Sequence, residues 1–386
     1  MELMRNSLQE TVERIDSANA GLLVQRGLAV FEKDGEKPMK SKHLRRIAGV
    51  NADELYKQAL SRWQLSTQRD DFACVFAKVQ GRMMMGLSLG GALDTGVISQ
   101  HSYGMPMIPA SSVKGVVRDY FERLYQAYDE QGKPLFHDKK PVLDDKWQAV
   151  SDVLFGTDDD SNANAGYVIW HDAWWMADTT KPFVVDVVTV HHQKYYGDEA
   201  TLSNALDNTE NPIPNEQLAV QGGFYFAVQG SDGWADYAKK LLSKALTDSG
   251  MGAKGSSGYG YFEIDKRATD NFAEQKIAAN KAMQHAQSLQ NLSPNQQIIQ
   301  QFMNGLPDES QWKGDPNKSP NVMIDGKSYN FATLFNMVKD WQEKDDVIFA
   351  IDMFKLKLPI LLGGPIPKHP KWKERINPLK KKFDIE

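Results

Sequence analysis

Apolar residues recur at two different spacings along this chain, and the change between them predicts its organisation. Up to residue 70 the spacing is three and four, as in Leu55, Ala59 and Leu60, which is typical of amphipathic helices. Phe72 opens a stretch rich in β-branched, aromatic and glycine residues, which favours strands and turns. After Asp265 the chain is rich in glutamine, asparagine and alanine and again favours helices. We therefore predict a helical N-terminal region at 1–70, a mixed core at 71–265, and a helical C-terminal extension at 266–386 with a basic tail.

The core predicts strands and helices in a repeated order. The segments 72–89 and 166–175 are strand-like and flank an amphipathic helical segment, 108–128. The same order returns where strand-like segments at 218–230 and 261–265 flank the helical segment 234–250. This order predicts the α+β class with a ferredoxin-like, RRM-like fold, in which both helices cover one face of an antiparallel sheet. The other face is then open to RNA or covered by insertions.

Three polar stretches interrupt this pattern. Residues 126–165 and 192–216 predict insertions in the core. The first insertion holds the acidic tract 158–160, which is typical of a solvated loop tip. The third stretch, 32–46, is basic and predicts a loop or a frayed helix.

Composition narrows the class of protein. The 386 residues carry a formal net charge of −5 and one cysteine, Cys74. One cysteine excludes a disulfide scaffold and a zinc site of paired thiolates. No apolar run reaches the length of about 18 residues that a membrane span needs, so we expect no membrane contact. Residues 1–16 contain no apolar signal core, which together with the single cysteine predicts a protein of the reducing cytoplasm. The acidic balance argues against a free-standing basic nucleic-acid binder but leaves room for a local basic groove.

The glycine-rich loop 250–260, GMGAKGSSGYG, is the first candidate binding site. Its glycines let backbone N–H groups approach a phosphate closely, and its lysine adds a positive charge. It is not a P-loop, because it runs from helix to strand and its lysine precedes a glycine. A long tight turn with several glycines at positive φ explains the same pattern without a ligand. The candidate RNA contacts here are Lys254, Gly255, Ser256, Ser257 and Tyr259.

The start of the first core helix, at 109–118, is the second candidate site. A helix N-terminus offers unpaired N–H donors to a phosphate, and Ser111 or Ser112 is expected to cap it. Lys114 and Arg118 are four residues apart and share a helix face. These four residues suit an RNA backbone, although an ordinary capped helix with solvated charges has the same pattern.

The histidines are the third candidate. His191 and His192 follow a strand-like run, close to Lys194. Adjacent strand residues point to opposite faces and no third ligand lies at metal spacing, so we expect no metal and no other cofactor. A histidine here can stack on a base or bond a phosphate, which makes His191 and Lys194 candidates for RNA contact. A histidine beside a lysine could also act as an acid or base in RNA cleavage.

Several motifs occur in an order that resembles the RAMP superfamily of CRISPR systems. They are GLSLGGALDTG, YGMPMIPASSVKGVVR, LFGT, GYVIWHDAWW and GMGAKGSSGYGYF. Within that superfamily, SANAGLLVQRGL, VDVVTVHHQKYYGDE and NPIPNEQLAV are similar to the family of sixth subunits of the type III-B (Cmr) complex. The resemblance covers about residues 17–265, and residues 266–386 lie outside it.

This resemblance implies an RNA-binding subunit of an antiviral ribonucleoprotein. It implies a place near the 3′ end of the CRISPR RNA (crRNA), where the subunit would cap the backbone filament and support recognition of target RNA. The implied protein partners are the repeated backbone RAMP subunit, a second RAMP subunit at the 3′ end, and small helical subunits. The segments 250–260 and 111–118 match the family's two signature segments, and the resemblance carries RNA contact over only to residues there.

The resemblance also implies which residue could cut RNA. In the related backbone subunit, an aspartate after a Gly-Ile-Val-like segment cuts target RNA, whereas here Ser99 stands at that place and Asp94 precedes the segment. We therefore expect a non-catalytic structural subunit. One alternative is a metal-independent RAMP endoribonuclease that uses His191 or His192 as acid or base. The other is a protein–protein adaptor without RNA contact.

Overall fold

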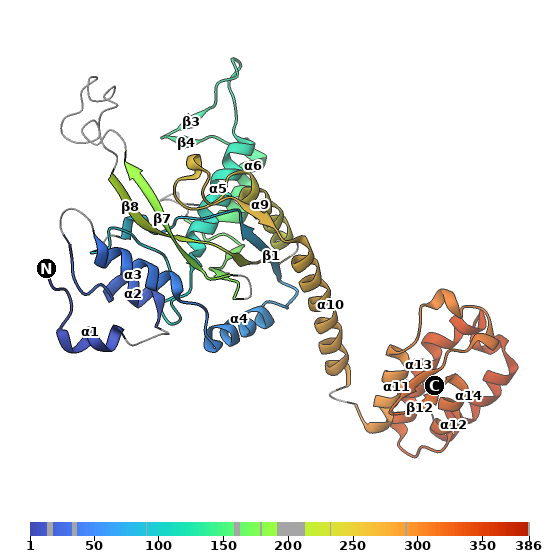
Figure 1. Ribbon diagram of the computed structural model, residues 1–386. Helices are drawn as coiled ribbons and strands as arrows, with labels where there is room; N and C mark the ends of the chain where they lie inside the picture. The colour runs from blue at the N-terminus through green and yellow to red at the C-terminus, as the bar shows by residue number, and fades with distance from the viewer. Residues whose placement is uncertain are drawn as a thin grey trace. The chain divides into compact units, whose positions relative to one another are not determined.

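The structure is a computed structural model that describes residues 1–13, 18–32, 37–89, 91–157, 163–177, 180–190, 213–231, 233–289 and 292–384. The chain forms two compact units, Met1–Ile277 and Ala278–Glu386, each with its own hydrophobic core (Figure 1). The two units meet inside helix α10 (Lys266–Leu289), whose first turns pack on the core of the first unit. Within the described residues, no helix has the length and apolar character to cross a membrane.

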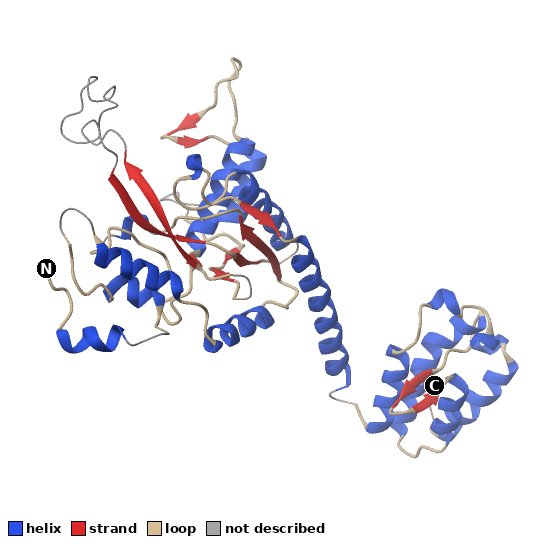
Figure 2. Cartoon of the chain, viewed as in Figure 1, coloured by secondary structure: helices blue, strands red, loops and turns tan. Residues whose placement is uncertain are grey.

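The first unit is built on an antiparallel sheet with the strand order β10-β1-β9-β6-β2, in which β5 also pairs with β9. Its strands are β1 (Phe72–Val79), β2 (Met107–Ile108), β5 (Ile169–Trp170), β6 (Ala173–Trp175), β9 (Gly223–Gln229) and β10 (Phe262–Ile264). Helix α5 (Ala110–Tyr125) lies between β1 and β6 in the chain, and helix α9 (Trp234–Asp248) lies between β9 and β10. This α+β connectivity agrees with the predicted ferredoxin-like order (Figure 2).

Helices α5 and α9 cover one face of this sheet. Side chains of alternate residues on a strand point to opposite faces, and Ala73, Val75 and Ala77 of β1 belong to the core on the α5 and α9 side. Phe224 and Phe226 of β9 join the same core and are at most 1% exposed. Burial of such side chains stabilises a fold by about 1.5–3 kcal/mol each.

The opposite face is covered as well. There Phe76 packs on Tyr225 and on Phe272 of α10, with ring centroids 4.9 and 5.6 Å apart. Trp63 of helix α4 (Glu54–Ser66) packs on Phe72, with centroids 6.3 Å apart. Of the two possibilities left open for this face, cover by other parts of the chain is the one observed, and the cover comes from α4 and α10 rather than from the predicted insertions.

The N-terminal region is helical, as predicted, but its basic stretch is more regular than expected. Helices α1 (Asn6–Glu13), α2 (Ala20–Arg26), α3 (Pro38–Gly49) and α4 precede the sheet. The prediction of a loop or frayed helix at 32–46 is wrong for α3, which is a regular helix with Leu44 and Ile47 fully buried. The Glu32 carboxylate accepts the N–H groups of Met39 and Lys40 at 3.0 and 3.3 Å and so caps this helix from outside.

Two predicted strands are each divided in the structure. The segment 218–230 is broken by Gly222, whose φ is +99°, and contributes to β8 (Ile213–Val220) and to β9. Strand β8 pairs with β7 (Phe183–Val190) in a separate two-stranded sheet. The segment 166–175 divides into β5 and β6 at His171 and Asp172, and both halves pair with β9.

The stretch 126–165 contains more structure than a polar insertion. It holds the short hairpin of β3 (Phe136–His137) and β4 (Lys140–Pro141), followed by helix α6 (Asp145–Phe155). Leu154 and Phe155 of α6 are buried in the main core, which makes this helix part of the first unit's packing.

The second unit is mostly helical. It contains α11 (Pro294–Asn304), β11 (Val322–Ile324), β12 (Lys327–Tyr329), α12 (Phe331–Lys339), α13 (Lys344–Leu362) and α14 (Pro370–Lys382). Asp346 of α13 is only 4% exposed and accepts hydrogen bonds from Ser293 Oγ and Asn295 Nδ2 at 2.5 and 2.7 Å. These bonds fix the start of α11 against α13.

The cover on the second face of the sheet leads to a test. Phe272→Ala removes a ring that is 8% exposed, which should cost about 3–5 kcal/mol and loosen the first turns of α10. We expect faster hydrogen exchange there and in β1. Ile277→Ala on the same helix removes a side chain that is 56% exposed and should leave the exchange rates unchanged. Equal rates in the parent and in Phe272→Ala would contradict this account of the cover.

Candidate nucleic-acid interface

The ends of the glycine-rich loop are fixed by backbone contacts. Ala253 N–H donates to the Met84 carbonyl at 2.7 Å, and Met251 N–H donates to the Gly260 carbonyl at 2.8 Å. A Cβ at Gly260 would lie 1.9 Å from the Met251 carbonyl oxygen, and a Cβ at Gly252 would lie 2.4 Å from that of Met84. Glycine is therefore required at both positions by backbone packing alone, which is the ligand-free explanation of the motif.

The middle of the loop is different, because it is open to solvent. Lys254, Ser256 and Ser257 are exposed, and no atom lies within 4 Å of a Cβ built at Gly255 or Gly258. Lys254, rather than Gly255, takes the left-handed conformation, with a φ of 62°. Such a conformation costs a non-glycine residue about 1–2 kcal/mol, and residues of this kind cluster at functional sites.

Tyr259, the last candidate in the loop, is tied to the β7–β8 hairpin. Its hydroxyl donates to Asp186 Oδ2 at 2.9 Å, and Arg82 Nη1 lies 2.8 Å from Asp186 Oδ1. Burial alone would raise the pKa of Asp186, but the hydrogen bonds from Arg82, Tyr259 and the Val187 N–H outweigh it and lower that pKa. The hydrogen bond to Asp186 raises the pKa of Tyr259. Tyr259 therefore supports the loop through its hydroxyl.

The start of α5 differs from the prediction. The N-cap is Pro109, not Ser111 or Ser112, and the Ala110 N–H donates to Asp172 Oδ1 at 2.7 Å. The cap comes from a residue distant in sequence because β2 pairs with β6 next to Asp172. Ser111 and Ser112 are exposed, so their hydroxyls remain open to a ligand, although the Asp172 carboxylate places a negative charge at this helix end.

The two basic residues of this helix have different environments. Arg118 Nε lies 2.7 Å from Glu122 Oε1, so its charge is already paired. Lys114 is half-buried and forms no ion pair within the part of the chain that the structure describes. Lys114 is therefore the better candidate for a phosphate contact.

The structure does not bring the loop and the start of α5 into one pocket. Tyr120 donates to Asp248 Oδ2 at 2.8 Å and Arg123 donates to Ser249 Oγ at 3.0 Å, so the end of α9 contacts the C-terminal half of α5. At a rise of about 1.5 Å per residue, Ser111 lies roughly 14 Å along the helix axis from Tyr120. A ligand that touched both segments would have to be extended, as a nucleic-acid strand is.

The third candidate group contains the two adjacent histidines and a nearby lysine. His191, His192 and Lys194 lie outside the described residues. Among the described residues, no three His, Cys, Asp or Glu side chains are grouped to hold a metal ion. His171 is described and packs between aromatic rings, 5.2 Å from Trp63 and 5.4 Å from Phe72, and burial lowers its pKa.

Asp94 takes part in an ion-pair cluster with α3. Its Oδ2 lies 3.3 Å from Lys37 Nζ and 3.9 Å from Lys40 Nζ, and its carbonyl accepts a bond from Gln217 at 3.0 Å. Lys40 is 5% exposed, and burial lowers its pKa despite the nearby carboxylate. The Asp94 carboxylate therefore joins its own loop, between β1 and β2, to the start of α3.

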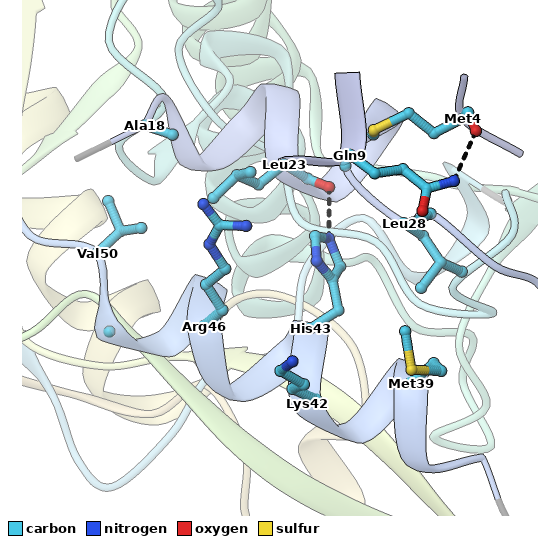
Figure 3. A pocket seen from close by; sticks show the side chains of 13 residues that line it. Met4, Gln9, Ala18, Leu23, Leu28, Met39, Lys42, His43, Arg46 and Val50 are labelled. Atoms are coloured by element: carbon cyan, nitrogen blue, oxygen red, sulfur yellow. Dashed lines mark hydrogen bonds between the residues drawn. The ribbon is translucent and has the colours of Figure 1, made fainter. Parts of the chain in front are cut away.

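The sequence patterns missed a cavity of about 500 Å³ between α1, α2 and α3. Figure 3 shows His43 and Arg46 extending from α3 toward α2, where His43 Nε2 lies 2.9 Å from the Leu23 carbonyl oxygen. Burial lowers the pKa of His43 and favours its neutral form. The basic stretch 32–46 was the available signal, but a cavity depends on how three helices pack.

Comparison with known proteins shows what the core is similar to. The sequence pattern of the RAMP superfamily matches residues 76–263, which contain most of the sheet, both core helices and both candidate segments. The match covers just under half of the chain, so residues 76–263 are similar to the RAMP superfamily, and that similarity implies a ferredoxin-like core.

The particular resemblance is to Cmr6 of type III-B CRISPR complexes. The chain is 26% identical over 225 residues to the CRISPR system Cmr subunit Cmr6 of Pyrococcus furiosus, a match that covers 47% of this chain and 65% of that protein. It is 26% identical over 195 residues to Cmr6 of Saccharolobus solfataricus, covering 48% and 55% of the two chains. These alignments span less than two thirds of either relative. A chain in the structure of the Type III-B Cmr-beta bound to cognate target RNA is 20% identical, with a TM-score of 0.44 and coverage of 61% and 78%.

The loop geometry predicts opposite effects of two substitutions. Lys254→Gly relieves a left-handed lysine and should stabilise the first unit by about 1 kcal/mol. Gly260→Ala introduces a Cβ 1.9 Å from a carbonyl oxygen and should destabilise the unit clearly. Thermal melting of both variants checks the signs. A Lys254→Gly variant that melts below the parent would show that the lysine side chain stabilises the loop.

The Arg82–Asp186–Tyr259 network predicts a pH dependence. The pKa of Asp186 is lower in the folded state than its ordinary value of 3.8, so its stabilisation is complete above that value and is lost as pH falls through the folded pKa. Asp186→Asn should therefore melt below the parent at neutral pH. The gap should narrow as pH falls below 3.8 and close once the parent's carboxyl is protonated as well. A gap that stays constant over this range would refute the assignment.

Proposed function

We propose that this chain is a non-catalytic, RNA-binding structural subunit of a type III-B CRISPR ribonucleoprotein in the cytoplasm. The observation that carries the proposal is the glycine-rich loop of the RAMP core, with fixed ends and a solvent-open tip at a left-handed Lys254. The resemblance to Cmr6 supplies the complex in which such a loop would work.

In this proposal the loop tip and the start of α5 contact the backbone of the crRNA near its 3′ end. Lys254 and Lys114 supply positive charges that form no ion pair among the described residues. Backbone and hydroxyl groups come from Gly255, Ser256, Ser257, Ser111 and Ser112. The covered sheet leaves no open RRM-like surface among the described residues, which favours contact through loops and helix ends. His191 and Lys194 stay candidates for the same RNA.

The proposed partners are those of a capping subunit. Besides crRNA and target RNA they are the repeated backbone RAMP subunit, the second RAMP subunit at the 3′ end, and the small helical subunit. The formal charge of −5 gives little electrostatic attraction to RNA, so we expect affinity to depend on assembly with these partners.

Cleavage of the target is assigned to another subunit. Ser99 stands where the backbone subunit has its aspartate, and the Asp94 carboxylate lies close to the Lys37 and Lys40 amines.

An Asp94→Asn variant tests this assignment. If the Asp94 carboxylate is only structural, assembled complexes that carry the variant should cut matched target RNA at every site that the parent cuts. Loss of one specific cut with assembly intact would give this subunit a catalytic role.

Co-purification from cells that express the whole complex tests the binding proposal. Lys114→Glu/Lys254→Glu should recover several-fold less guide RNA per subunit, more so at higher salt, because two phosphate contacts become repulsive. Lys133→Glu/Lys281→Glu makes the same charge change at exposed lysines outside the candidate segments and should match the parent. Equal recovery of RNA by both double variants would reject the proposed interface. A parent chain that recovers neither RNA nor partners would reject the subunit role.

A further inference from the structure

The exposed face of α14 is strongly basic. Lys371, Lys373, Lys381 and Lys382 are exposed, and Lys380 is half-buried. The same helix buries Trp372, Ile376 and Leu379 at a spacing of three and four, so its apolar stripe faces the unit's core. The lysines occupy the flanks and the solvent side of the helix.

These charges form no ion pair within the part of the chain that the structure describes. Lys368, just before the helix, and the lysines of α14 have no carboxylate within 4 Å among the described residues, whereas Lys355 and Lys357 of α13 each have one. The helix dipole accounts for cations in the last turn. It disfavours them in the first turn, where Lys371 and Lys373 lie. Helix stability therefore does not explain the pattern.

The helix is held firmly in its own unit. Arg375 stacks over the Trp372 ring at 4.9 Å and over Phe335 of α12 at 5.8 Å. The charge of the two units also differs in sign. The second unit has 15 lysines and arginines against 12 aspartates and glutamates, whereas the first has 30 against 38. The net positive charge thus belongs to the unit that lies outside the RAMP region, and α14 packs on the core of that unit.

We propose that α14 is a second, sequence-independent binding surface for the phosphate backbone of single-stranded RNA. It is distinct from the interface on the RAMP core. The choice of RNA as the nucleic acid rests on the proposed function. Lys368, Lys371, Lys373, Lys380, Lys381 and Lys382 supply the contacts, and each neutralises one phosphate and releases its counterion.

The composition of this face favours a polyanion over other partners. A bilayer or a protein interface would call for exposed apolar anchors beside the charges. The large apolar residues of α14 are buried, and none of the exposed ones described in this unit lies on this helix. Lys382 Nζ lies 4.8 Å from the centre of the half-buried Phe383 ring, but no exposed large apolar side chain described in this unit accompanies the lysines on the helix. Such a face suits a backbone without base recognition.

The test measures binding of the full-length chain to a fluorescent single-stranded RNA of mixed sequence over a range of salt concentrations. Lys380→Glu/Lys381→Glu/Lys382→Glu should weaken binding at least tenfold near physiological salt. It should also reduce the magnitude of the slope of log affinity against log salt by about 2, because each of the three lost phosphate contacts contributes about 0.7. Lys371→Gln/Lys373→Gln should have a smaller effect in the same direction. The matched control, Lys313→Glu/Lys327→Glu/Lys339→Glu, changes exposed lysines elsewhere in this unit and should bind within about twofold of the parent.

The outcomes separate this surface from the proposed function. Loss of affinity only in the α14 variants, with unchanged melting and normal recovery of Cmr partners, supports the second surface. Equal losses in the control variant, or no loss in the α14 variants, overturn it. Unchanged RNA binding with lost binding to vesicles of phosphatidylserine overturns it in favour of a membrane. If the parent assembles with no CRISPR partner yet the α14 variants still lose RNA, the proposed function fails and this inference stands.

Discussion

Strands β1 and β9 carry apolar side chains on both faces, and this constraint shapes the whole first unit. A sheet with one solvent-exposed face would alternate apolar and polar residues along each strand. Here Phe76 and Tyr225 are buried on one face of the sheet, and Val75 and Phe226 are buried on the other. Both faces must be covered, so α5 and α9 pack on one side and α4 and α10 on the other. The first turns of the C-terminal extension are thereby required by the core.

The covered sheet moves possible RNA contacts to its margins. What remains there are backbone groups at tight turns, helix ends and single lysines such as Lys114 and Lys254. Several neighbouring charges already stabilise the protein, including Arg118 with Glu122, Arg82 with Asp186, and Lys40 with Asp94. Positive residues in the sequence therefore overstate the charge that a ligand would meet.

Local patterns predicted the repeated order of core strands and helices, the α9 helix and the glycine-rich turn, because spacing and glycine content reflect short-range geometry. These patterns failed where a residue far away in the sequence determines the local structure. Asp172 caps α5 in place of Ser111 or Ser112, and Glu32 and the buried Leu44 and Ile47 make α3 a regular helix. Cover of the second sheet face by Phe272, which packs on Phe76, likewise joins segments about 200 residues apart.

The left-handed conformation of Lys254 has a consequence for natural variation at that position. Most replacements would keep the backbone strain and lose the charge. Asparagine tolerates positive φ better than other non-glycine residues, and its codons are a single base change from those of lysine. Drift that loses the charge should therefore pass through asparagine. A lineage that retains lysine there keeps a residue that the backbone itself does not favour.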